Sequence, residues 1–193
     1  MIFYTADLHF GHENVIKFCN RPFSDIEEMN EALIKNWNSV VTENDTVYIV
    51  GDFCYRSAFT MKPVLMRLKG TKHLITGNHD HVWLKSIKPD DFFASISPLM
   101  EIADGDNIVV LCHYPMLCWN RSNHGSIHIH GHIHNNLHRD ENGFIFSVLR
   151  DIKAYNAGVD VNGYVPVTLE QLKENKEKFY KEHAADIKYR GKN

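Results

Sequence analysis

Seven side chains that can bind a metal ion follow apolar stretches of this sequence. They are Asp7, His9, Asp52, Asn78, His113, His132 and His134. Their donor atoms are nitrogen and carboxylate or amide oxygen, with no thiolate, a set that suits zinc, iron or manganese better than calcium or copper(I). Seven ligands exceed one tetrahedral site, but they fit two metal ions if one carboxylate is shared. Asp52 is our candidate for the bridging ligand.

The spacing within two short motifs supports this interpretation. Asp7 and His9 are two residues apart, so on an extended segment both side chains face one cavity. His132 and His134 repeat this spacing just after a glycine, at the end of an alternating strand predicted over 126–130. Each motif alone has a simpler explanation, because Asp-x-His tripeptides are common by chance and a single histidine at a strand end is more often structural.

The stretch Gly77-Asn78-His79-Asp80 could supply acid chemistry beside these ligands. His79 can donate a proton near neutral pH, and Asp80 could orient its ring and fix its tautomer. The alternative is an Asx-type turn, in which Asn78 and Asp80 only satisfy local backbone groups.

Four further residues are candidates for contacts with a substrate, namely Arg56, His12, Trp119 and Arg121. Arg56 could clamp a phosphate oxygen through two hydrogen bonds. Trp119 could stack on a base or ring, with Arg121 supplying charge. Each has a simpler alternative, which is a solvated or salt-bridged arginine, a histidine at the start of a helix, or a solvent loop fixed by one aromatic residue.

The elements that must position these residues are short apolar strands. We predict strands over 2–5, 46–50, 73–76, 108–112 and 126–130, and the candidate ligands lie at or just past their C-terminal ends. Open α/β sheets bind their ligands at that edge. The continuous apolar run 46–50, flanked by helical segments, indicates a parallel sheet covered on both faces.

Helices are predicted over three stretches, from Ser24 onward, within 53–70, and from Thr168 to about His183. The first begins with a capping box formed by Ser24 and Glu27. Residues 144–148 are predicted to form a closing strand, because the preceding Asn142-Gly143 is typical of a hairpin turn.

Length and composition are those of an ordinary globular protein. The 193 residues can bury a full core as one domain over 1–193. The formal charge of -3 gives no general attraction to nucleic acid or to an anionic membrane. We expect the first residues to form a strand and not a signal peptide, and no apolar run reaches membrane-spanning length. Because the four cysteines form no Cys-x-x-Cys pair, we expect a cytoplasmic protein.

The order Asp-x-His, Gly-Asp, Gly-Asn-His-Asp, His and Gly-His-x-His resembles the calcineurin-like metallophosphoesterase superfamily. These motifs run from residue 7 to residue 134, about two-thirds of the chain, and together they are highly specific. Protein Ser/Thr phosphatases of this superfamily carry Gly-Asp-x-Val-Asp-Arg-Gly and Gly-Asn-His-Glu. This chain instead has Gly51-Asp52-Phe53-Cys54-Tyr55-Arg56-Ser57 and Asp80. It is more similar to small bacterial or phage-type phosphoesterases.

The resemblance implies an α/β fold of the metallophosphoesterase type, a four-layer sandwich of two packed mixed β-sheets flanked by helices. It also implies a division of the ligands, with Asp7, His9, Asp52 and His134 at one metal ion and Asp52, Asn78, His113 and His132 at the other. By the same resemblance, His79 is the acid or substrate contact and Asp80 supports it.

The expected activity is metal-dependent hydrolysis of a phosphodiester or phosphomonoester in a nucleotide-like or small organic substrate. Two cations roughly 3.5–4 Å apart can hold a bridging hydroxide as nucleophile and neutralise charge on the phosphoryl group. No feature of the sequence indicates an oligomeric state. Two alternatives stay open, a non-catalytic metal-binding scaffold of the same fold and a nuclease, which would need a wider basic surface.

Overall fold

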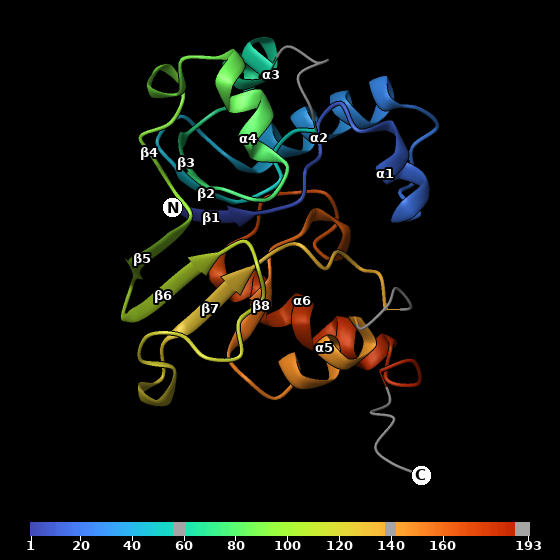
Figure 1. The fold of residues 1–193 in the computed structure, drawn as a ribbon, viewed down its shortest axis with the longest axis vertical. Coiled ribbons are helices and arrows are strands. Elements are labelled where there is room, and N and C mark those ends of the chain that lie inside the picture. The colour runs from blue at the N-terminus through green and yellow to red at the C-terminus, as the bar shows by residue number, and fades with distance from the viewer. Residues whose placement is uncertain (56–60, 138–141, 188–193) are drawn as a thin grey trace.

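Two four-stranded sheets pack face to face, and helices cover the outer face of each (Figure 1). The structure is a computed structural model that describes residues 1–55, 61–137 and 142–187. The four layers, helix, sheet, sheet and helix, confirm the predicted α/β fold class.

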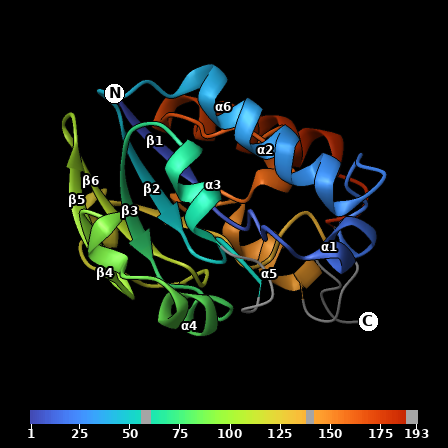
Figure 2. The same ribbon diagram turned by 90° about the horizontal axis from the view of Figure 1, so that it is seen from above.

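The first sheet has the strand order β1-β2-β3-β4 and is parallel throughout. Its strands are β1 (Ile2–Thr5), β2 (Thr46–Val50), β3 (Thr71–Ile75) and β4 (Ser95–Ser97). The main helices of this layer are α2 (Ile26–Val40) and α3 (Met61–Arg67), which lie over the strands when the molecule is seen from above (Figure 2). The expected mixed pairing is therefore wrong for this sheet, because each of its connections crosses over instead of forming a hairpin.

The second sheet is mixed and has the order β5-β6-β7-β8. Its strands are β5 (Leu99–Asp104), β6 (Asn107–Cys112), β7 (Ile127–His130) and β8 (Ala154–Asn156). The hairpin of β5 and β6 is antiparallel, whereas β6, β7 and β8 are mutually parallel. Its outer helices are α5 (Asn142–Leu149) and α6 (Leu169–Glu182).

Short helical turns occupy the connections between these elements. The α-helical turns are α1 (Glu13–Phe18) and α4 (Asp80–Trp83). The 3-10 turns are η1 (Leu84–Ser86), η2 (Pro89–Asp91), η3 (Ser122–His124) and η4 (Val159–Val161). No helix among the residues of known placement has the length and apolar character needed to cross a bilayer.

The core between the two sheets is built from alternate residues of their strands. Tyr4 and Val50 of the first sheet pack with Leu111 and Ile129 of the second, and all four side chains are fully buried. The side chains on the other faces pack under the helices, as Trp37 of α2 does. The inner strands, such as β2 and β7, are therefore held on both faces, so the loops at their ends project from a rigid frame.

Two local predictions are wrong. The run after Asn142 forms α5 and not a strand, because Phe146 and Leu149, three residues apart, are both buried in one cluster while Phe144 is exposed. The N-cap of α2 lies one residue later than predicted, since the Asp25 carboxylate accepts the hydrogen bond from the Glu28 backbone N–H. The predicted helix at Thr168 is confirmed, and Thr168 forms its capping box with Gln171.

Candidate metal centre

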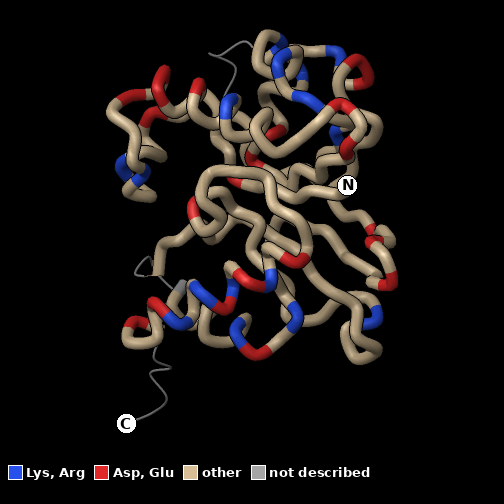
Figure 3. Tube along the Cα trace, turned by 180° about the vertical axis from the view of Figure 1, so that it is seen from behind, with Lys and Arg blue, Asp and Glu red and all other residues tan. Residues whose placement is uncertain are grey.

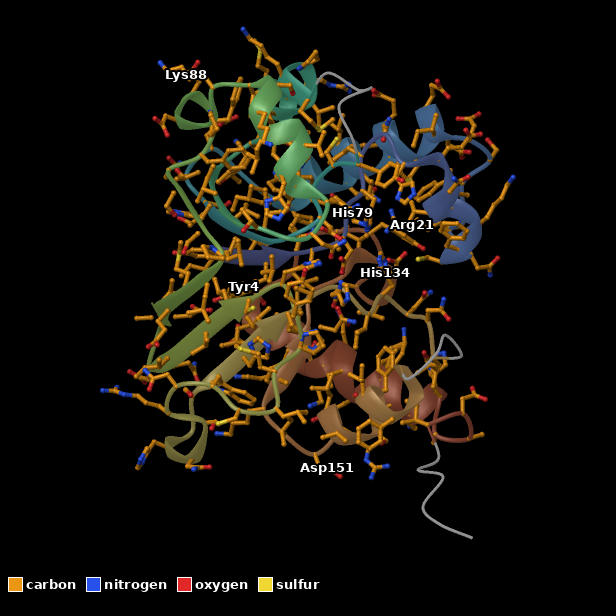
Figure 4. All side chains as sticks on the ribbon, in the orientation of Figure 1. Tyr4, Arg21, His79, Lys88, His134 and Asp151 are labelled. Carbon is orange, nitrogen blue, oxygen red and sulfur yellow. The ribbon has the colours of Figure 1, made fainter. Side chains whose placement is uncertain are left out.

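The polar residues predicted to bind metal come together where the strands of both sheets end. Asp7 and His9 follow β1, Asp52 follows β2, Asn78 follows β3, His113 follows β6, and His132 and His134 follow β7. Five have left-handed backbone, with φ between 49° and 74°: Asp7, His9, Asp52, His132 and His134. Residues other than glycine rarely adopt this conformation, and such strained positions gather at functional sites. Figure 4 shows His79 and His134 close to the junction of the two sheet layers.

One group of ligand atoms consists of Asp7, His9 and His134, whose donor atoms lie within 4.8 Å of one another. The Asp7 carboxylate is fully buried and is held by the backbone N–H of His132 at 3.0 Å and 3.1 Å from its two oxygens. His134 directs Nε2 toward Asp7 Oδ1, at 4.0 Å. This group therefore presents one carboxylate and two imidazoles to a common point.

A second group consists of Asp52, His113 and His132, again with donor atoms within 4.8 Å. The Nδ1 atom of His113 lies 2.9 Å from the Val50 carbonyl oxygen. Because a carbonyl only accepts hydrogen bonds, Nδ1 is the donor, which leaves Nε2 facing Asp52 Oδ2 at 3.3 Å. Asn78 Oδ1 lies 3.2 Å from the same His113 Nε2 and adds an amide oxygen to this group.

Asp52 lies between the two groups. Its Oδ2 atom is 3.7 Å from His9 Nε2 of the first group and 3.3 Å from His113 Nε2 of the second. A single carboxylate thus faces imidazole nitrogens from both groups, as a bridging ligand must.

These residues fit a metal ion by their chemistry and by one unsatisfied atom. His9 Nε2 is buried and has no hydrogen-bond partner in the described structure, although it points at Asp52. Buried polar nitrogens normally have a partner, so this atom is suited to ligate a cation. Positive charge is favoured at His113 in particular, whereas burial lowers the pKa of His9 and of His132. Although burial opposes that charge, the hydrogen bond to Asp52 and the charges of Asp7 and Asp52 raise the pKa of His113 to about 9.

Glycines permit the close approach of these loops. A Cβ atom on Gly131 would lie 2.7 Å from Asp7 Oδ2, closer than real side chains pack. A Cβ atom on Gly77 would collide with the Asp52 carboxylate. The two glycines of the Gly-His-x-His and Gly-Asn-His-Asp motifs therefore make room for the carboxylates that the metals would need.

His79 reaches the same centre, but Asp80 does not support it as predicted. His79 Nε2 lies 3.9 Å from Asp52 Oδ2, and its side chain is 35% exposed, so the ring is open to solvent. The buried Asp80 carboxylate instead accepts hydrogen bonds from three backbone N–H groups and from the Trp83 indole. Two of those backbone groups belong to Asp52 and Phe53, so Asp80 fixes the Asp52 loop and does not set the His79 tautomer.

The predicted substrate contacts are placed unequally. His12 is at the centre, with Nδ1 3.4 Å from His9 Nδ1. Arg56 lies outside the described residues. Trp119 is buried in a core cluster, and its indole donates to Ser126 before β7. Arg121 borders a cavity by the β5–β6 turn, about 20 Å of strand away from the residue after β6. Trp119 and Arg121 are therefore not brought to the centre, which corrects that expectation.

Two functional candidates were missed from the sequence. Asp160, in η4, accepts a hydrogen bond from His134 Nδ1 at 2.7 Å and is paired with the Arg21 guanidinium at 2.8 Å and 3.0 Å. Arg21 also donates to the carbonyl oxygens of Asp7 and Leu8. Asp160 follows β8, as the candidate ligands follow their strands, so the same positional rule could have found it. No sequence signal distinguishes Arg21 from a surface arginine.

Comparison with known proteins places the chain in a family. Residues 1–102 match the calcineurin-like phosphoesterase family. An uncharacterized protein of Methanocaldococcus jannaschii is 38% identical over 173 residues, 89% of this chain and 88% of that protein. The gene 66 protein of Mycobacterium phage L5 is 31% identical over 158 residues, 68% of this chain and 76% of that protein. A solved protein of unknown function from Aquifex aeolicus has a TM-score of 0.68 and 25% identity, covering 90% of this chain and 98% of that one.

The chain therefore belongs to the calcineurin-like phosphoesterase family, and the resemblance predicted from its motifs is confirmed. Membership supports hydrolysis of phosphate esters with the help of bound metal. The clusters of Asp and His described above are able to hold metal ions.

Proposed function

We propose that this protein is a dinuclear metal-dependent phosphoesterase that hydrolyses a phosphodiester or phosphomonoester. One observation carries the proposal. The Asp52 carboxylate lies between two groups of ligands, and His79, a residue that can move a proton, approaches the same Asp52 oxygen. A scaffold that only bound metal would have no use for a solvent-accessible imidazole at this position.

The proposed ligands are divided between two ions of manganese, iron or zinc. Asp7, His9, Asp52 and His134 would hold the first, and Asp52, Asn78, His113 and His132 the second. When bound, the ions supply activated water and neutralise the charge of a phosphoryl group. This explains how a chain with a net charge of -3 could bind an anion.

The protein's own residues would position and protonate the substrate. The His79 backbone N–H donates a hydrogen bond to Asp52 Oδ1 at 2.9 Å. This bond fixes the His79 backbone relative to the proposed ligands. Its ring is open to solvent and can donate a proton to the leaving oxygen, an effect worth about 10²–10⁴ in rate. His12, beside His9, is a second candidate for contact with the substrate.

The proposed substrate is a small phosphate ester that carries a nucleotide-like or other organic group. In Figure 3, Lys and Arg are interspersed with Asp and Glu over the described chain and do not gather into one broad basic face. This distribution favours a substrate held at the metal centre over a polymer held by its backbone charge. We also propose a cytoplasmic location, since no disulfide joins the four cysteines, all of which are described.

Replacing His79 tests the proposal. In manganese-loaded protein, His79→Ala should lower kcat by about 10²–10⁴ on an alkyl phosphodiester while metal content stays near two ions per chain. The loss should be smaller on bis-p-nitrophenyl phosphate, because a good leaving group needs less help from an acid. Elemental analysis and steady-state kinetics supply the two measurements.

His81→Ala is the matched control, because His81 is an exposed histidine two residues further along the chain. It should keep wild-type activity. Equal turnover by His79→Ala and wild type would refute the role of His79. Metal-saturated wild type that hydrolysed no phosphate ester would favour the scaffold, and salt-dependent cleavage confined to oligonucleotides would favour a nuclease.

A further inference from the structure

A row of aromatic rings leads outward from the metal centre on the side of His79. The rings belong to Phe18, His12, Tyr55 and His79, and we name the first three the aromatic wall. They come from separate parts of the chain, the end of α1, the turn before it and the loop after β2. Their proximity is therefore a product of the fold and not of sequence neighbourhood.

The rings of the wall are in mutual contact. His12 stacks on Tyr55 with centroids 3.7 Å apart and planes within 11°. Phe18 meets His12 edge to face at 6.3 Å. The edge-to-face pair has a preferred arrangement of aromatic rings, and the stacked pair is in close contact, so the wall is a preformed surface.

The wall begins at the proposed reaction centre. His12 lies 5.1 Å from the ring of His9, a candidate ligand, and Tyr55 lies 5.1 Å from the ring of His79. If His79 protonates the leaving oxygen, the group attached to that oxygen lies beside the wall. The outer end is Phe18, a residue with a large apolar ring that is 60% exposed.

We propose that the aromatic wall is the leaving-group subsite and that it takes a flat aromatic group, such as the base of a nucleotide. This inference rests on the proposed function and names its substrate class. Bases stack on aromatic side chains with little regard to sequence, because every base has a π-face. An exposed ring one step beyond a phosphate site is suited to that contact, whereas a short alkyl group would leave Phe18 in water.

Binding of two related phosphates tests the subsite without requiring turnover. Adenosine 5′-monophosphate and ribose 5-phosphate carry the same phosphate and sugar, and only the first has a base. Manganese-loaded wild type should bind the first more tightly, and Phe18→Ala should reduce this preference roughly fivefold or more, the range known for single stacking side chains. Phe18→Trp should preserve or increase it. Isothermal titration calorimetry measures all the affinities.

Phe144→Ala is the matched control, since Phe144 is another phenylalanine with 55% exposure, on α5. It should keep the wild-type preference. Equal affinity of wild type for the two phosphates, or an unchanged preference in Phe18→Ala, would overturn the subsite. Ester hydrolysis without base preference refutes the subsite alone. Base preference without any ester hydrolysis supports the subsite and refutes the proposed catalysis.

Discussion

Asp160 offers a sharp test of how the fold orients His134, a proposed metal ligand. Its carboxylate accepts the Nδ1 hydrogen of His134 at 2.7 Å, and the Asp160 and Arg21 side chains are both fully buried. Although burial opposes ionisation, the charge of Arg21 and the hydrogen bond from His134 hold the pKa of Asp160 below its usual range. Asp160 therefore fixes the orientation of the His134 ring and makes Nε2 a stronger electron-pair donor to a metal ion.

Asp160→Asn keeps the shape of this residue but removes its charge and one of its acceptor oxygens. We expect manganese affinity to fall about 10–100-fold, or about 1.4–2.8 kcal/mol, as for other residues that support a ligating histidine. Because the Arg21 charge stays buried, the free energy of unfolding should also fall by about 3–5 kcal/mol. Titration against a competing chelator gives the affinity, and urea unfolding of metal-free protein gives the stability.

The control separates metal binding from stability. Asp45→Asn removes a carboxylate that accepts hydrogen bonds from the Thr42 backbone N–H and hydroxyl, at the opposite end of β2 from Asp52. It should destabilise the protein while leaving manganese affinity unchanged. If folded Asp160→Asn bound manganese as tightly as wild type, the proposed role of Asp160 would be refuted.

Two further predictions follow from single residues. Asp52→Asn should leave less than one metal ion per chain by elemental analysis and abolish ester hydrolysis, because the shared carboxylate is lost; two retained ions would contradict its bridging role. Lys176→Met should lower the free energy of unfolding by about 2–3 kcal/mol in urea, because Lys176 Nζ donates to the carbonyl oxygens of Leu149, Ile152 and Ala154. The control is Lys178→Met, because the Lys178 side chain is exposed; we expect it to change the free energy of unfolding by less than about 0.5 kcal/mol. Equal losses of stability in the two variants would refute the role of the Lys176 hydrogen bonds.

The sequence predicted the strands better than their surroundings. Apolar runs such as 46–50 form strands in the structure, since their β-branched residues are buried on both faces. The run 144–148 was misassigned because a short apolar stretch after Asn-Gly has no clear period, and only the cluster around Phe146 and Leu149 favours a helix. Long-range packing decided that segment.

The site shows the same division. The convergence of the candidate ligands could be predicted because parallel strands bring their C-terminal ends to one edge, which makes position along a strand informative. Asp80 could not, since its hydrogen-bond partners Asp52 and Phe53 lie 28 and 27 residues earlier. Trp119 was misjudged because the path of a loop is set by tertiary contacts, here a hydrogen bond to Ser126.

Anomalous diffraction from crystals of manganese-loaded protein tests the central claim most directly. We expect two manganese peaks in each chain, one contacting Asp7, His9 and His134, the other contacting His113 and His132, with Asp52 touching both. Peaks at other residues, or a single ion that leaves one of these groups without a metal at saturating manganese, would contradict a two-metal phosphoesterase centre.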